Sequence, residues 1–484
     1  MSRPVVWAIV LIGIMSLIRL YTAFNFPLTT DEAYYWTWSL HPSFGYTDHP
    51  PMVAWLIMLG SVFGHSYGAV RLPFVIAEAV AALAVGMAAK LLIGDVRAGT
   101  YAAIVFALIP QTKLEFAESI PDGAYMLTWA LSLWAAAALA RRASPQATVA
   151  LGAALAATVY SRTFGWALVF GIAGWAVSAR RDLLRPVGVA CSIAVIAYVP
   201  FLLWNASVGW ETFAFEFVHR QDITTFSAAL LFNIVTMRTL LYGLLIVGLT
   251  WLVALRRPPL LPLVAWTALP LPLVLFALSF ATQTETYWIL GPATSLSIGC
   301  GAVLARASVR WRTAGFAALG IAAAAATIPA LFLALPENAQ AAAFRGDPAL
   351  RAQFRSGTHA YAALARDLRP LAAAGVAIYT DRYETSSELL WYGLPSTIVV
   401  YRGQLAQWMR WYRPAAVPAR AVLVIPARED GSAFPVSPSV QAAYARVGPP
   451  QRLVYLYGGE LEGMFYAWRL DGPRPDARRV LPGM

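Results

Sequence analysis

The chain has 484 residues, of which 59% are hydrophobic and only 13% are charged, and its mean hydropathy is +0.59. These values exclude an ordinary soluble domain, and the many apolar runs indicate a polytopic membrane protein. A net charge of +11 is compatible with nucleic-acid binding, but the basic residues gather at the ends of apolar runs, where membrane orientation explains them better. Cys191 and Cys300 lie inside such runs and do not report the redox compartment.

The apolar runs predict about eleven membrane-spanning helices. The shortest are the two on either side of Arg162. The predicted spans are 5–24, 69–93, 98–114, 123–141, 147–160, 164–179, 187–204, 227–254, 259–281, 287–305 and 313–334. With the N-terminus in the cytoplasm, the inward connections are the ones rich in Lys and Arg, as the positive-inside rule requires. The first loop, Arg162 and the loops at 113–122, 205–226 and 283–285 then fall on the outer side, so polar chemistry is predicted at one membrane face.

After Pro336 the composition changes. A helix-like stretch at 341–371 is followed by short apolar runs at 376–379, 397–401, 421–425 and 453–457, with turn residues between them. The predicted fold is therefore mainly α, a polytopic helix bundle followed by an extracytoplasmic α/β domain. The predicted domains are 1–336, with an outer first loop at 25–68, and 337–484.

The first outer loop places acids and imidazoles among aromatic side chains. Asp31 and Glu32 follow two threonines, which is typical of a helix N-cap, and a carboxylate there can also act as a general base or orient an acceptor hydroxyl. Asp48 and His49 precede two prolines, which hold His49 in place. This His suits a phosphate contact, a proton shuttle or a hydrogen-bonded interfacial residue. A solvated loop with interfacial aromatics is the alternative for the whole segment.

Acids gather again before the span at 123–141, at Glu115, Glu118 and Asp122. Asp122 is expected to cap that helix. Since capping needs one acid, the group suggests a shared site for a polar acceptor or a cation. The spacing is not diagnostic of a metal, so a divalent cation stays an alternative.

Arginines on the predicted outer side suit an anionic ligand. Arg162 lies between two short apolar runs, where it either extends to the interface or meets an anion, and its forked donors suit a phosphate. Arg220 follows His219 in another outer loop. Arg71 begins a span, where pairing with an acid is equally expected. Acids for an acceptor and cations for a phosphate, beside a membrane, suit transfer from a lipid-phosphate donor.

These features resemble the GT-C superfamily of integral-membrane glycosyltransferases. The nearest groups are family 39, the dolichyl-phosphate-mannose protein O-mannosyltransferases and their bacterial relatives, and family 83, the aminoarabinose lipid A transferases. Four passages carry the resemblance: 31–35, 45–51, 121–122 and 200–220. One departure is that His49 stands where the lipid A transferases have a lysine, which gives Arg162 more of the phosphate contact.

The resemblance implies that Asp31 is the catalytic carboxylate of an inverting transfer. The residues predicted to form the site are Asp31 and Glu32 for catalysis; Asp48, His49, Asp122, Glu118 and Tyr35 for substrate binding; and Arg162, His49, Arg220 and Arg71 for the donor phosphate. No metal ligand is predicted.

The predicted function is transfer of a sugar from a polyprenyl-phosphate donor, such as undecaprenyl phosphate, to a lipid, glycan or protein acceptor. The reaction is expected at the outer face of a bacterial inner membrane, as in lipid A modification or protein O-mannosylation, with no nucleic acid involved. Two alternatives remain. A flippase or transporter of polyprenyl-linked lipids predicts charges near mid-membrane and symmetric halves. A non-catalytic envelope assembly protein predicts no turnover.

Overall fold

The computed structural model describes residues 3–109, 117–216, 261–279, 285–343, 357–399, 405–428, 430–457 and 459–481. The chain divides into two compact units. The bundle unit comprises Met1–Ala23, Ser43–Gly64 and Gly68–Ile328, and the sheet unit comprises Phe24–Pro42, His65–Tyr67 and Pro329–Met484. The division falls at Pro329, close to the predicted limit at 336. It differs in the first loop, whose segments 24–42 and 65–67 group with the sheet unit. The predicted domain limits stay a prediction.

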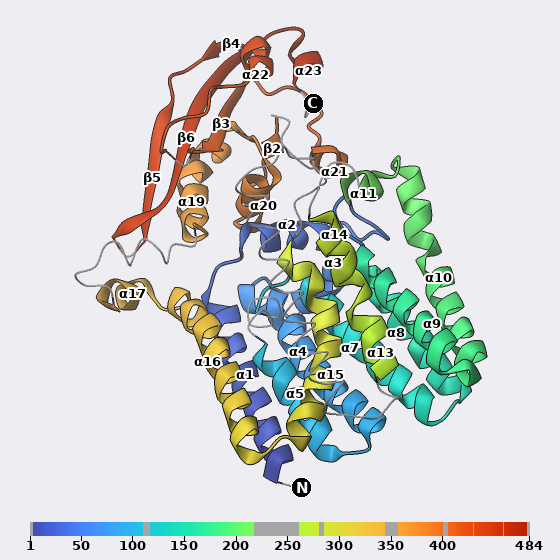
Figure 1. The fold of residues 1–484 in the computed structure, drawn as a ribbon. Coiled ribbons are helices and arrows are strands. Elements are labelled where there is room, and N and C mark those ends of the chain that lie inside the picture. Colours follow the sequence, from blue (N-terminus) through green and yellow to red (C-terminus); the bar gives the residue numbers. More distant parts are fainter. Residues whose placement is uncertain are drawn as a thin grey trace. The chain divides into compact units, whose positions relative to one another are not determined.

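The bundle unit consists of apolar helices (Figure 1). They are α1 (Arg3–Asn25), α3 (Met52–Ser61), α4 (Tyr67–Ile93), α5 (Val96–Leu108), α7 (Pro121–Arg141), α8 (Pro145–Ser161), α9 (Trp166–Ala179), α10 (Leu184–Ser207), α11 (Glu211–Ala214), α13 (Leu261–Ala268), α14 (Pro270–Leu278), α15 (Leu290–Arg306) and α16 (Val309–Leu333). Within the described residues, six helical segments are long and apolar enough to cross a membrane: 3–25, 67–93, 121–141, 181–207, 287–306 and 309–333.

Most predicted spans coincide with helices. Two of them, 227–254 and 259–281, leave the expected number of spans open. The span at 227–254 lies outside the described residues. The span at 259–281 corresponds to two short helices, α13 and α14, which meet at Leu269 just before Pro270. The count of about eleven therefore stays a prediction.

Small residues allow the bundle helices to pack closely. A Cβ atom on Gly301 of α15 would lie 2.5 Å from the backbone nitrogen of Ala102 in α5, so only glycine permits this approach. In the most apolar stretch of the segment 287–306, which contains α15, 78% is buried, whereas in the corresponding stretch of α16 only 6% is buried. Helix α15 is therefore internal to the bundle, and α16 presents most of its surface outward.

The sheet unit combines helices with a six-stranded sheet in the order β2-β1-β3-β6-β4, with β5 also paired to β6. Its elements are α2 (Thr30–Ser39), α17 (Glu337–Ala343), α19 (His359–Ala373), β1 (Ala377–Thr380), α20 (Tyr383–Trp391), β2 (Thr397–Ile398), α21 (Leu405–Tyr412), β3 (Arg420–Pro426), α22 (Pro438–Ala443), β4 (Tyr444–Val447), β5 (Gln451–Tyr457), β6 (Glu460–Pro473) and α23 (Ala477–Val480) (Figure 1). β1 is parallel to β2 and β3, and β6 is antiparallel to β3, β4 and β5.

Helices cover both faces of this sheet. Successive side chains of a strand point to opposite faces, so alternate residues of β3 pack against different helices. On β3, Val422 and Val424 pack in one cluster with α19 residues such as Leu364. Leu423 and Ile425 pack in another cluster, with residues of α22 and α23. The predicted α/β composition of this region is confirmed.

Candidate functional site

The first predicted acids lie at the start of α2, in the sheet unit. Thr29 is the N-cap, and Glu32 completes a capping box, because its carboxylate accepts from the Thr29 N–H at 2.9 Å. The N-cap expectation is therefore confirmed, and it gives Glu32 a structural role. Glu32 is fully buried, whereas Asp31 is exposed in the same turn. Of the two acids, only Asp31 is accessible to solvent.

The aromatic residues of α2 pack against α20. The rings of Tyr34 and Tyr383 lie 4.2 Å apart between centroids, and those of Trp36 and Trp391 lie 4.9 Å apart. Tyr35, predicted to bind substrate, is buried and stands edge-on to Trp38 at 4.9 Å. The contacts of Tyr34 and Trp36 hold the helix that carries Asp31 against α20 within the sheet unit.

A second acidic group, missed by sequence reasoning, lies near Asp31. Burial raises the pKa of Glu384, in the first turn of α20; the negative charges of Asp31 and Asp381 raise it further, while Arg382 lowers it. The Arg382 Nη2 donates to the buried Asp381 carboxylate at 2.8 Å. The signal available in the sequence was an Asp-Arg-x-Glu run directly after a predicted strand. A partly buried carboxyl whose pKa is raised, with other acids beside it, is a candidate for acid–base work.

The bundle unit contains the predicted Asp122 and Arg162 as a buried ion pair. Arg162 Nη1 donates to Asp122 Oδ1, and the two residues are 1% and 4% exposed, respectively. Asp122 lies in the first turn of α7 but is not its cap, since Ile120 occupies that position without a side-chain hydrogen bond. The expected cap is thus wrong; the carboxylate instead meets Arg162. Arg162 ends α8, at the predicted break before α9.

Glu216 connects this pair with His49. Its carboxylate lies 3.2 Å from His49 Nδ1, both side chains being buried, and its charge acts on Arg162. The guanidinium of Arg162 also lies 5.2 Å from the centroid of the Tyr287 ring. Sequence reasoning missed Glu216 and Tyr287 as site residues. Asp48 is buried beside His49 in the chain.

Helix α11 fixes the segment that precedes His49. Thr47 donates its hydroxyl to Glu211 Oε2 at 2.9 Å, and Thr212 donates to the Tyr46 carbonyl at 2.7 Å. The ring of Trp204 covers Gly45 so closely that a Cβ there would lie 2.2 Å from it. His49 is therefore held by tertiary contacts in addition to the prolines that follow it.

The three remaining predicted residues are Arg71, Glu118 and Arg220. Arg71 is buried and its Nη1 donates to the Ala23 carbonyl at 3.1 Å, which ties the start of α4 to α1. Glu118 is half-buried just before α7, and Arg220 lies outside the described residues. Within the described ranges, no group of three or more His, Cys, Asp or Glu residues is placed to hold a metal ion.

Comparison with known sequences supports the predicted resemblance. Residues 48–204 match the family described as dolichyl-phosphate-mannose-protein mannosyltransferase. The lipid A galacturonosyltransferase RgtD of Rhizobium johnstonii is 27% identical over 213 residues, which are 42% of this chain and 43% of that protein. The alignment thus spans less than half of that relative.

Solved structures match nearly the whole chain. The crystal structure of ArnT from Cupriavidus metallidurans bound to undecaprenyl phosphate has a TM-score of 0.64 at 14% identity, covering 95% of this chain and 98% of ArnT. The apo structure gives 0.61, covering 98% and 100%. The chain therefore has an ArnT-like fold, a helix bundle with a C-terminal sheet, and these matches agree with the predicted resemblance to the GT-C glycosyltransferases.

Proposed function

We propose that this multi-pass membrane protein, a relative of the GT-C glycosyltransferases, transfers a sugar from a polyprenyl-phosphate donor to an acceptor at the outer face of a bacterial inner membrane. The observation that carries the proposal is the buried Asp122–Arg162 pair with Glu216 and His49 beside it. All but Glu216 lie inside the region that matches the mannosyltransferase family. The ligand of the ArnT crystal structure, undecaprenyl phosphate, supports the donor class.

The donor phosphate is the proposed ligand of the basic residues. Arg162 presents a planar set of donors, only part of which Asp122 occupies, so it can stabilise a departing phosphate. His49, held against Glu216, supplies a second contact. Arg71 and Arg220 are proposed for the same role. Because Arg71 donates to the Ala23 carbonyl, its first role is to join α4 to α1.

The acceptor is proposed to meet Asp31. Its carboxylate orients or deprotonates the acceptor hydroxyl, which attacks the anomeric carbon on the side opposite the phosphate and inverts that carbon. Glu32 contributes by fixing the first turn of α2. The resemblance implies that Glu32, Asp48 and Asp122 shape the acceptor and sugar site, and Glu118 and Tyr35 are proposed to bind substrate beside them. If the acceptor is itself a phosphate, it is already ionised, so Asp31 contributes more by positioning the acceptor than by removing a proton.

The acceptor class favoured here is a lipid. The name of the Rhizobium relative specifies lipid A, whereas the matched family is named for protein mannosylation. The proposed mechanism requires no cofactor, and a divalent cation stays an alternative.

One observation favours the transporter alternative. Arg19 of α1 and Glu78 of α4 form an ion pair at 2.8 Å, with both side chains almost fully buried inside apolar helices, and intramembrane charges are commonly functional. Their mutual pairing, together with the Arg71–Ala23 bond between the same helices, also explains them as a fixed packing contact.

The test is an assay of isolated membranes with a radiolabelled polyprenyl-phosphate sugar. Release of free polyprenyl phosphate only when a lipid acceptor is added supports the transferase. Movement of intact lipid-linked sugar across vesicles, with no acceptor-dependent release, would replace this proposal with the transporter. Turnover of neither kind would favour the assembly protein.

A further inference from the structure

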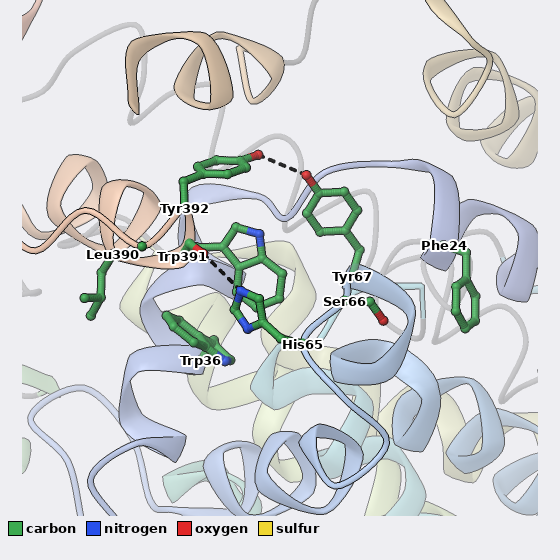
Figure 2. Close-up of a pocket in the computed structure, with 9 residues that line it drawn as sticks. Phe24, Trp36, His65, Ser66, Tyr67, Leu390, Trp391 and Tyr392 are labelled. Carbon is green, nitrogen blue, oxygen red and sulfur yellow. Dashed lines mark hydrogen bonds between the residues drawn. The ribbon is translucent and has the colours of Figure 1, made fainter. Parts of the chain in front are cut away.

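We infer that the sheet unit contains a second ligand site, a pocket at the C-terminal end of α20 that binds a neutral sugar ring. The pocket has a volume of about 710 Å³, within the range of small-molecule sites, roughly 300–1,000 Å³. Residues of the sheet unit alone line it: the end of α1, α2, the segment 65–67 and the end of α20 (Figure 2). Asp31 and Glu384 lie at the other ends of α2 and α20.

Trp391 organises the wall of this pocket. Its ring lies 3.9 Å from the His65 ring, 4.9 Å from the Trp36 ring in an edge-on arrangement and 5.7 Å from the Tyr67 ring in a nearly parallel one. Figure 2 shows these rings gathered together, with Phe24 standing apart from them. A sugar ring has an apolar face of C–H bonds, which packs well on such rings because their faces carry partial negative charge.

Neutral polar groups lie at the edge of the same wall. The hydroxyls of Tyr67 and Tyr392 are 3.1 Å apart, and His65 Nε2 donates to the Trp391 carbonyl at 3.0 Å. A tyrosine hydroxyl has one donor and two acceptor positions, so Tyr67 can bond a ligand in addition to its bond with Tyr392. Sugar hydroxyls, which both donate and accept, match this edge.

The charge of the lining selects against anionic ligands. Among the nine residues that line the pocket there is no Asp, Glu, Lys or Arg. Arg369, outside the lining, donates to the Tyr392 carbonyl at 3.0 Å. The C-terminal end of a helix carries partial negative charge, which disfavours a phosphate or a carboxylate. A neutral sugar ring is therefore the better ligand.

Aromatic residues at a membrane surface also act as interfacial anchors. Here Trp36 and Trp391 are only 7% and 5% exposed, which is too little for either ring to act as such an anchor. The inference rests on the proposed function in one respect only, that the bound ring belongs to the sugar headgroup of the lipid acceptor.

The test measures saccharide binding to the full-length protein in detergent, without donor, by saturation-transfer difference NMR. The probes are methyl β-glucoside and diacetylchitobiose, with glucose 1-phosphate and galacturonate as charged comparators. Ser66 is exposed at the pocket, so Ser66→Trp fills the space without removing a buried group. Trp391→Ala removes the central ring, and Trp391→Phe restores an aromatic face. Trp411, which stacks on His41 elsewhere in this unit, supplies the control Trp411→Ala.

We expect the neutral saccharides to bind, and to bind at least about tenfold more weakly in Ser66→Trp and Trp391→Ala. Trp391→Phe and Trp411→Ala should stay close to the wild type. Absence of neutral-saccharide binding, equal binding of the charged comparators, or full binding by Ser66→Trp overturns the inference. If saccharides bind as expected but membranes show no acceptor-dependent transfer, the proposed function fails and the pocket stands.

Discussion

Arg162 and Asp122 carry opposite charges in a place from which water is excluded. Burying an ion costs several kcal/mol, and the attraction between the partners offsets that cost only while both are present. Such a pair is not needed for a stable bundle, since apolar side chains would fill the space at lower cost. We therefore propose that its place at the break between α8 and α9 serves a ligand that needs the guanidinium.

Removing one partner separates these roles. We expect Arg162→Met to destabilise the protein by about 3 kcal/mol, because it leaves the Asp122 charge buried without its partner. The double variant Arg162→Met with Asp122→Asn should recover most of that stability but not the transfer activity. Thermal unfolding in detergent and the transfer assay measure the two effects. Recovery of transfer by the double variant would show that the pair is structural only.

The sequence was sufficient to predict individual site residues but not the residues that they contact. Arg162, Asp122 and His49 were predicted as site residues because each interrupts or borders an apolar run. Glu216 was not, since its place beside His49 and Arg162 depends on how α10 and α11 return to the first loop, which no local pattern encodes.

Among the elements, α19 begins with an unusual residue. His359 stacks on Tyr457 at 3.7 Å between ring centroids. Burial lowers the pKa of His359 to about 4, although Glu337 acts in the opposite direction. An unfolded His has a pKa of about 6.5, so the folded state binds fewer protons between these values. Stability contributed by the neutral ring is complete above pH ~6.5 and is lost as the pH falls toward ~4.

We therefore expect acid to destabilise the wild type more than His359→Phe, which keeps the stacked ring and cannot be protonated. The expected difference is about 2 kcal/mol between pH 7 and pH 4, allowing for the partial exposure of the ring. Thermal unfolding of both full-length proteins at these pH values measures it. Glu384, whose raised pKa stabilises the folded state at low pH, affects both proteins equally. If His359→Phe loses as much stability as the wild type between pH 7 and pH 4, this explanation is contradicted.

Strongly patterned elements were predictable. The expected strand at 421–425 is β3, and the expected spans at 69–93 and 123–141 are α4 and α7. Strand β6 was missed because Glu460–Pro473 mixes glycine, charged and aromatic residues without clear alternation. Helix α3 was read only as an apolar segment after the prolines, since it is too short to span.

For the whole molecule, the positive-inside pattern predicts which side of the membrane each connection faces. Replacing Cys191 and Cys300 with alanine gives a background for single reporter cysteines. Ala445→Cys in β4 and Ala143→Cys between α7 and α8 are both at exposed positions. We expect a membrane-impermeant maleimide to label Ala445→Cys in intact spheroplasts, and Ala143→Cys only after permeabilisation. The reverse pattern would contradict the proposed orientation.

In the proposed mechanism, Asp31 acts on the acceptor while Arg162 and His49 hold the donor phosphate. The most direct measurement compares kcat and the KM for the polyprenyl-phosphate sugar between the wild type, Asp31→Asn and His49→Ala. We predict that Asp31→Asn lowers kcat by a factor of about 100 to 10,000 and leaves the donor KM nearly unchanged, whereas His49→Ala raises the donor KM. Undiminished kcat in Asp31→Asn, at normal membrane expression, would contradict the account.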